Sequence, residues 1–274
     1  MIQSFSDYQA FDPSTDPGDF IYLYKDLPDS LDSLCNLVQN QLVHPWNGGP
    51  QPYGRRYEPR NNHRVANMLE QLVQMNPDGL VMDRLLDERV IASCRENALL
   101  LTSILRYQGI PTRVRASWVK YLSSDQSKFT DHWVSEVGHE DEKRWLLVDT
   151  NPKRIDLPPS EFQPGGAAWL QLRAGEAAPE TYRTDDDLFY VKLNFGHDFN
   201  AVLGTGPHYW EAPPLFYVKM QEMEEWQLAL LDRLANLLEN PDQNLDELQQ
   251  LQQEYEVLQG LESAWPIFEQ TVYS

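Results

Sequence analysis

A capped apolar helix near the middle of the chain constrains the fold most. Ser93-Cys94-Arg95-Glu96 has the Ser-x-x-Glu pattern of a capping box and leads into the apolar run Ala98 to Leu105. The pattern predicts that Ser93 is the N-cap and that Cys94 lies in the first helical turn. The free N–H groups and the helix dipole favour a thiolate over a thiol there, and Arg95 adds a nearby positive charge.

Two strands separated by a polar turn follow this helix. Phe129 to Val137 and Arg144 to Thr150 are rich in Trp, Val and Leu. A hairpin with Glu140 and Asp141 at its tip pairs residues whose numbers sum to 281, which places His132 opposite Asp149. Such neighbours have Cβ atoms about 4.5–5.5 Å apart. An Asp beside a His fixes its tautomer and stabilises the imidazolium that forms when the His takes a thiol proton.

These segments resemble the core of the transglutaminase-like superfamily, which is related to papain-like thiol enzymes with a Cys-His-Asp triad. The superfamily pattern runs Gly-x-Cys-x-Asp-x-Ala, Gly-Ile-Pro-Ala-Arg, His-Trp-Val-Glu and Trp-Val-x-x-Asp. The matching segments in this chain are Ala92-Ser93-Cys94-Arg95-Glu96-Asn97-Ala98, Gly109-Ile110-Pro111-Thr112-Arg113, His132-Trp133-Val134-Ser135-Glu136 and Trp145-Leu146-Leu147-Val148-Asp149. Ala92 stands where the pattern has Gly, and Glu96 stands where it has Asp. The resemblance implies that Cys94 is a nucleophile, His132 its base and Asp149 the acid that orients the base.

The resemblance also implies an α+β fold. In that fold a transglutaminase-like, papain-like core packs the helix carrying Cys94 on an antiparallel sheet, with additional N- and C-terminal helices. Apolar residues at helical spacing predict helices over Leu31 to Val43 and Asn62 to Met75. Cys35 belongs to the first of these apolar faces and is expected to be buried. Arg113 to Tyr121 alternates as a third strand, and Gly166 to Arg173 predicts a short helix.

The C-terminal part predicts an acidic helical hairpin. One helix is expected over Leu215 to Leu238 and a second over Leu245 to Ser263, with Asn240-Pro241-Asp242 between them. From Glu211 onward there are 13 acidic and two basic residues, a net charge of −11. The expected apolar stripe consists of Met220, Met223, Trp226, Leu230 and Leu234. These features predict a catalytic domain over residues 1–210 and a helical hairpin packed on it over 211–274. The hairpin is either a solvated layer or a docking surface for a basic protein partner.

Composition excludes several classes of partner. A net charge of −20 argues against binding to nucleic-acid backbones and to anionic membranes. Two cysteines do not make a disulfide framework. Met1 to Asp7 lacks the basic and apolar regions of a signal peptide, and no apolar run approaches the ~18 residues of a membrane span. We therefore expect a cytoplasmic protein, where reducing conditions suit a working thiol.

Other polar residues give weaker signals. Asn194 to Pro214 is interpreted as a loop after a strand or buried segment at Leu188 to Leu193. Candidate substrate contacts are Trp133 and three residues of this loop, namely His197, Asn200 and Trp210. The spacing of His197-Asp198 and His208 matches no standard zinc pattern, so no metal is expected. Acyl chemistry on a cysteine needs no cofactor, so none is expected.

Two further features concern charged side chains. His44 to Arg60 is a Pro- and Gly-rich loop in which Arg55, Arg56 and Arg60 either bind an anionic group or balance acidic neighbours. Glu136 shares a strand face with His132 and either lines the cleft or is a solvated side chain, and we favour the solvated side chain.

The predicted chemistry is cysteine-dependent acyl transfer or amide hydrolysis through a thioester on Cys94, on an amide- or thioester-containing small molecule or peptide. One alternative is a cysteine peptidase, which shares the triad. Another is a non-catalytic binding protein that keeps the fold.

Overall fold

The computed structural model describes residues 5–45, 62–80, 82–125, 127–182, 187–206 and 208–263. These residues form two compact units. We call the first the α3 unit, after its central helix α3 (Cys94–Tyr107); it comprises described residues of 5–114 and 133–157. We call the second the α5 unit, after α5 (Phe189–Val202); it comprises described residues of 115–132 and 158–263.

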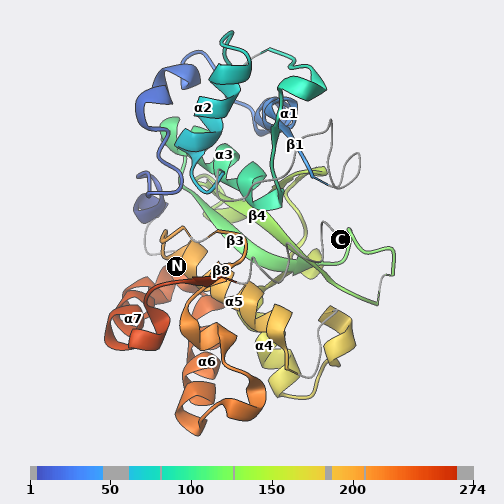
Figure 1. Ribbon diagram of the computed structural model, residues 1–274, viewed down its shortest axis with the longest axis vertical. Helices are drawn as coiled ribbons and strands as arrows, with labels where there is room; N and C mark the ends of the chain where they lie inside the picture. The colour runs from blue at the N-terminus through green and yellow to red at the C-terminus, as the bar shows by residue number, and fades with distance from the viewer. Residues whose placement is uncertain are drawn as a thin grey trace. The chain divides into compact units, whose positions relative to one another are not determined.

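The longer strands form one antiparallel sheet, which with the helices confirms the predicted α+β class (Figure 1). Its strand order is β6-β5-β4-β3-β7. The strands of this sheet are β3 (Thr112–Val119), β4 (Thr130–His139), β5 (Arg144–Thr150), β6 (Lys153–Ile155) and β7 (Phe162–Pro164). The chain divides between the two units within β3 and within β4.

Each unit has its own helices. The α3 unit adds α1 (Leu31–Gln41), α2 (Val65–Met75) and the short parallel strands β1 (Leu42–Val43) and β2 (Val90–Ile91). In this unit α3 contacts α1, α2 and β5. The α5 unit adds α4 (Gly165–Arg173), α6 (Glu225–Leu238), α7 (Pro241–Glu254) and the antiparallel pair β8 (Glu211–Ala212) and β9 (Glu262–Ser263). Here α4 packs on α5 and α6, and α7 packs on α6 (Figure 1).

Helix α3 is buried from Cys94 to Arg106, so its polar side chains need internal partners. The Ser103 hydroxyl donates to the Thr15 carbonyl at 2.6 Å, and Arg106 Nε donates to the Thr112 carbonyl at 2.8 Å. The N-terminal segment and the start of β3 thus satisfy polar groups of the central helix.

Several sequence predictions are confirmed. Strand β5 has the predicted bounds, and β3 and β4 lie within two residues of theirs. Cys35 on α1 is fully buried, as predicted. The structure adds that Ser30 caps this helix by accepting the Ser33 N–H at 3.2 Å. Helix α4 begins one residue before the predicted Gly166.

The predicted hairpin register is wrong. The β4–β5 pairs run from Ser135 with Val148 to His139 with Arg144, and their numbers sum to 283 rather than 281. A two-residue turn at Glu140 and Asp141 would require left-handed backbone that these residues disfavour. The observed turn has four residues, and only its last, Lys143, has a positive φ (50°).

Residues 189–202 form α5, so the strand alternative for Leu188 to Leu193 is wrong, as is the loop interpretation for Asn194 to Val202. The buried-segment alternative agrees with the burial of Val191 and Leu193. This helix is buried on nearly all sides, so it lacks the polar face that reveals an amphipathic helix. A Cβ on Gly196 would lie 2.8 Å from both Ala212 and the Phe216 ring, so glycine permits close packing at this point.

The first C-terminal helix begins later than predicted, at Glu225 instead of Leu215. The preceding residues form short 3₁₀ turns at Pro214–Tyr217 and Met220–Glu222. Tertiary contacts hold them, because the Met220 N–H donates to Asp187 Oδ1 at 2.6 Å. Leu230 and Leu234 of the expected stripe are buried, whereas Trp226 is 44% exposed. The second helix starts earlier than predicted, at Pro241.

Glu136 is buried, which corrects its interpretation as a solvated side chain. Its Oε2 lies 2.5 Å from Arg113 Nε. The Arg113 guanidinium also lies over the rings of Tyr8 and Trp145, at 4.8 and 4.4 Å from the ring centroids. Burying a charge requires this kind of pairing, and the ion pair therefore belongs to the core of the α3 unit.

An ion pair between Asp12 and Arg106 (2.6 Å) gives a pH-dependent prediction. Burial alone raises the pKa of Asp12, but Arg106 and hydrogen bonds from Ser14 outweigh burial and lower it overall. A lowered folded pKa stabilises the fold above the unfolded pKa of about 3.9, and this contribution is lost as the pH falls. Asp12→Asn should lower the free energy of unfolding by ~1–3 kcal/mol at pH 7.

Urea unfolding at several pH values checks this, and the difference from wild type should shrink below about pH 4. The exposed Asp29→Asn is the matched control and should change little. A difference that is independent of pH would contradict a role for the Asp12 charge.

The C-terminal helices should be integral to the α5 unit. Leu248 on α7 is fully buried, whereas Leu261 is 46% exposed. Leu248→Ala should cost ~2–5 kcal/mol of stability because it leaves a cavity, while Leu261→Ala should stay within about 0.5 kcal/mol. Thermal unfolding of the two variants makes the comparison. Equal melting temperatures for Leu248→Ala and wild type would show that α7 is not part of the cooperative fold.

Candidate functional site

Cys94 is the first residue of α3, and its local structure follows from the predicted capping box. The Glu96 carboxylate accepts hydrogen bonds from the Ser93 N–H at 2.7 Å and from the Ser93 hydroxyl at 2.6 Å. Cys94 is 7% exposed. The cap thus fixes the thiol at a helix N-terminus, where backbone N–H groups and the dipole favour negative charge.

The segment that leads into α3 is anchored as well. Ile91 pairs with Val43 in a two-stranded parallel sheet, and the Ala92 N–H donates to the Val43 carbonyl at 2.9 Å. Asn62 Nδ2 donates to the Ile91 carbonyl at 2.7 Å. These bonds hold the backbone directly before Ser93. They therefore also constrain the position of Cys94.

Arg95 points into the protein interior. It is 1% exposed and lies 3.2 Å from the Glu96 carboxylate. Its guanidinium lies 5.8 Å from the centroid of the Trp133 ring, and Trp133 is itself only 3% exposed. The candidate substrate contact Trp133 therefore packs on the charged side chain that follows the cysteine, a cation–π arrangement.

His132 lies on β4 and is 5% exposed. The Ser117 hydroxyl of β3 donates to the His132 carbonyl at 3.0 Å. The Tyr121 ring meets the imidazole edge to face, with centroids 6.2 Å apart. Backbone and ring contacts therefore constrain the histidine within the α5 unit.

Asp149 lies on β5 and is 2% exposed. Its Oδ1 accepts the Asn151 N–H at 2.9 Å, and Gln39 Nε2 of α1 donates to the neighbouring Thr150 carbonyl at 2.5 Å. If the observed hairpin register is extended by one pair beyond Ser135 and Val148, Asp149 lies opposite Val134 and not opposite His132. Cys94, Trp133 and Asp149 belong to the α3 unit, and His132 belongs to the α5 unit.

The second thiol differs sharply from Cys94 in its surroundings. Cys35 lies on α1 and is fully buried. Burial is the main reason why the pKa of this thiol is raised to about 12; Asp149 and Asp32 raise it further, and Lys153 opposes them. Cys35 therefore stays protonated at neutral pH.

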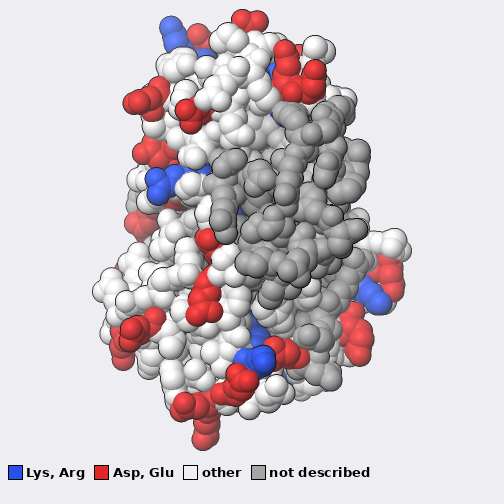
Figure 2. Space-filling view, viewed as in Figure 1, with Lys and Arg blue, Asp and Glu red and all other residues white. Residues whose placement is uncertain are grey.

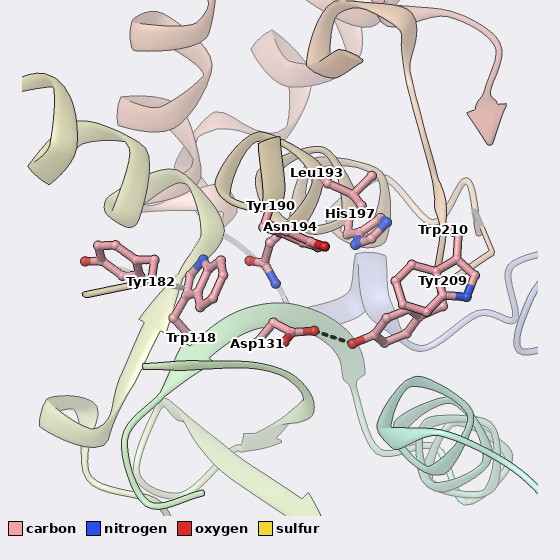
Figure 3. A pocket seen from close by; sticks show the side chains of 9 residues that line it. All are labelled: Trp118, Asp131, Tyr182, Tyr190, Leu193, Asn194, His197, Tyr209 and Trp210. Atoms are coloured by element: carbon pink, nitrogen blue, oxygen red, sulfur yellow. Dashed lines mark hydrogen bonds between the residues drawn. The ribbon is translucent and has the colours of Figure 1, made fainter. Parts of the chain in front are cut away.

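The α5 unit contains a pocket of about 240 Å³ that the sequence did not reveal (Figure 3). Part of the lining comes from one face of α5, at helical spacing. The remaining residues lie at the end of β3, at the start of β4, and in the segments that contain Tyr182 and Tyr209. The lining consists of Trp118, Asp131, Tyr182, Tyr190, Leu193, Asn194, His197, Tyr209 and Trp210. The spacing 190, 193, 194 and 197 could have indicated this helix face.

The structure brings together two of the predicted loop residues and separates the third. His197 and Trp210 line the aromatic pocket, although His197 lies on α5 and not on a loop. Asn200, also on α5, lines a different cavity of about 440 Å³ together with Thr205. The Thr205 hydroxyl donates to Asn200 Oδ1 at 2.9 Å. Arg55, Arg56 and Arg60 lie outside the described residues.

The polar residues near His197 have structural partners. Asp198 and Arg115 form a buried bidentate ion pair, at 2.7 and 2.9 Å. His208 lies 3.8 Å from Glu211. Over the described ranges, no three His, Cys, Asp or Glu side chains group as a metal site would require.

The surface is predominantly acidic. Figure 2 shows that Asp and Glu side chains outnumber Lys and Arg on the face in view, in keeping with the net charge of −20. Helices of the described part of the chain are too short or too polar to cross a membrane.

Comparison with known protein families identifies a match to part of the chain. No curated protein matches this chain. Residues 60–150 match the family described as the transglutaminase-like superfamily. The matched range includes α2, α3, β3, β4 and β5, and it contains Cys94, His132 and Asp149. Over residues 60–150 the chain is therefore similar to the transglutaminase-like superfamily.

Proposed function

We propose that this protein is a thiol acyltransferase or amidase in which Cys94, His132 and Asp149 act together. The main support for this proposal is that Cys94 is the first residue of a capped, buried helix. This helix lies within residues 60–150, which match the superfamily. The superfamily includes many Cys-His-Asp thiol enzymes, and a helix N-terminus favours the thiolate that such enzymes use.

The proposed reaction has two steps. His132 takes the thiol proton, the Cys94 sulfur attacks the carbonyl carbon of an amide or thioester, and the proton passes to the departing amine or thiol. An amine or water then attacks the resulting thioester, gives its proton to His132, and the proton returns to the Cys94 sulfur as the product leaves. Asp149 would orient the imidazole, and the Cys94 N–H is a candidate oxyanion donor. The reaction requires no cofactor.

Two alternatives remain distinct hypotheses. A cysteine peptidase would use the same steps on a peptide bond. The low exposure of Cys94 (7%) and His132 (5%) favours the second alternative, a non-catalytic binding protein. If the protein is an enzyme, a small electrophile should react with the Cys94 sulfur in the folded protein. If it is a non-catalytic binding protein, the sulfur should be inaccessible. A cytoplasmic location, and a basic protein partner for the acidic C-terminal helices, stay predictions.

The two thiols should differ in reactivity. At pH 6.5 an ordinary thiol with a pKa near 8.5 is only about 1% ionised, and Cys35, with a pKa of about 12, is ionised far less. We expect brief iodoacetamide treatment at this pH to label Cys94 and leave Cys35 unlabelled, as located by mass spectrometry of tryptic peptides. His132→Ala should slow labelling of Cys94.

Cys35→Ala is the matched control and should leave the labelling rate of Cys94 unchanged. Labelling of Cys94 only after denaturation would support the binding-protein alternative and contradict the enzyme proposal.

Asp149→Asn should preserve the fold and lose most activity. The amide has nearly the size of the carboxylate but cannot stabilise the imidazolium, and the corresponding change in a serine enzyme costs about 10⁴-fold in kcat. Turnover of p-nitrophenyl acetate, an activated acyl donor, provides the measurement. Asp141→Asn makes the same chemical change at the exposed hairpin turn and should retain wild-type turnover. Activity of Asp149→Asn within a few-fold of wild type would exclude Asp149 from the triad.

A further inference from the structure

The aromatic pocket of the α5 unit has the composition of a site for an organic cation. Five of its nine lining residues are Trp or Tyr, and none of these nine described residues is Lys or Arg. Asp131 is the one acidic side chain in the lining and lies exposed to solvent. Aromatic faces and a carboxylate both attract positive charge, and aromatic cages recognise quaternary ammonium groups in this way.

The side chains surround the pocket from several directions (Figure 3). Trp118 and Tyr182 lie on one side, and Tyr209 and Trp210 lie on the other. Asp131 lies across the pocket from α5. A ligand in this pocket would therefore meet aromatic side chains on two sides and the Asp131 carboxylate on a third.

Contacts with neighbouring residues hold these walls in place. Trp118 and Tyr182 meet edge to face at 5.2 Å, and the Tyr182 hydroxyl donates to Gln163 at 2.9 Å. Tyr209 and Trp210 meet edge to face at 4.5 Å. A pocket whose walls are fixed before binding loses less entropy when the ligand binds.

Asp131 is also held in place, because the Tyr209 hydroxyl donates a hydrogen bond to its carboxylate. This bond joins the acidic residue at the pocket to one of the aromatic walls. Tyr209 is an uncharged partner, so this bond brings no positive charge to the pocket.

We propose that this pocket binds a quaternary ammonium group, such as the trimethylammonium head of a small ligand. Its volume of about 240 Å³ is below the ~300–1,000 Å³ of drug-sized sites, so a small head group suits it. A primary ammonium has three donors that need acceptors, whereas a trimethylammonium has none. The strongly acidic chain would further attract cations. This proposal is independent of the chemistry at Cys94.

Choline and its uncharged analogue 3,3-dimethyl-1-butanol, which replaces nitrogen by carbon, test the proposal. Calorimetric titration of the full chain at pH 8, where imidazoles of ordinary basicity are neutral, should show choline binding at least about tenfold more tightly than the analogue. Equal affinities would show an apolar pocket without cation selectivity and would overturn the proposal. A choline Kd above about 10 mM would overturn it too.

Variants locate the binding site. Asp131→Asn should weaken choline binding roughly fivefold and leave the neutral analogue unaffected, because it removes charge without volume. Trp210→Ala should weaken choline binding about tenfold, and Trp210→Phe should restore most of it because an aromatic face returns. Trp226→Ala removes an exposed Trp on α6 outside the pocket and should bind choline as wild type does.

Circular dichroism checks that each variant folds. Folded Asp131→Asn and Trp210→Ala proteins that keep wild-type choline affinity would place the binding elsewhere and refute this site. Cys94→Ser should bind choline unchanged, which separates this result from the outcome for the acyl chemistry.

Discussion

The burial of α3 along its length is the constraint on which the α3 unit depends. A helix without a solvent face must satisfy its terminal N–H groups and every polar side chain within the protein. Glu96 meets part of this need by accepting two hydrogen bonds from Ser93. Arg95 pairs with Glu96 and lies over Trp133. These interactions satisfy the buried polar groups of the helix, and they also hold Cys94 at the helix N-terminus. The same contacts therefore support the stability of the fold and the proposed chemistry.

The α5 unit also contains a buried helix, α5, whose polar side chains need partners within the protein. Asp198 of α5 is fully buried and is neutralised by a bidentate pair with Arg115 of β3. Gly196 lets Ala212 and Phe216 approach the helix closely. With its other sides packed, α5 turns Tyr190, Asn194 and His197 toward the pocket, which gives the pocket one rigid wall. The acidic residue and aromatic residues of this pocket come from segments distant in sequence, so only the fold brings them together.

Sequence patterns predicted elements whose signal is local. The capping box located the start of α3, and two segments rich in Trp, Val and Leu on either side of a polar turn located β4 and β5. Patterns failed where tertiary packing decides the outcome. Helix α5 is buried on nearly all sides and carries buried polar residues among its apolar ones, so it shows no clear amphipathic pattern. The hairpin register depended on the four-residue turn that ends at Lys143, which has left-handed backbone. The aromatic pocket was also missed, because its residues span positions 118 to 210. The roles of His132 and Asp149 follow from motif order and stay proposals.

Trapping the acyl-enzyme tests the central claim most directly. The protein would be mixed with p-nitrophenyl acetate, quenched in acid within its first turnover, digested and analysed by mass spectrometry. If Cys94 is the nucleophile, one acetyl group is expected on the peptide that contains Cys94 and none on the peptide that contains Cys35. Cys94→Ser should lose both adduct and turnover. Turnover that persists in Cys94→Ser, or acetylation only at other side chains, would contradict a nucleophilic role for Cys94.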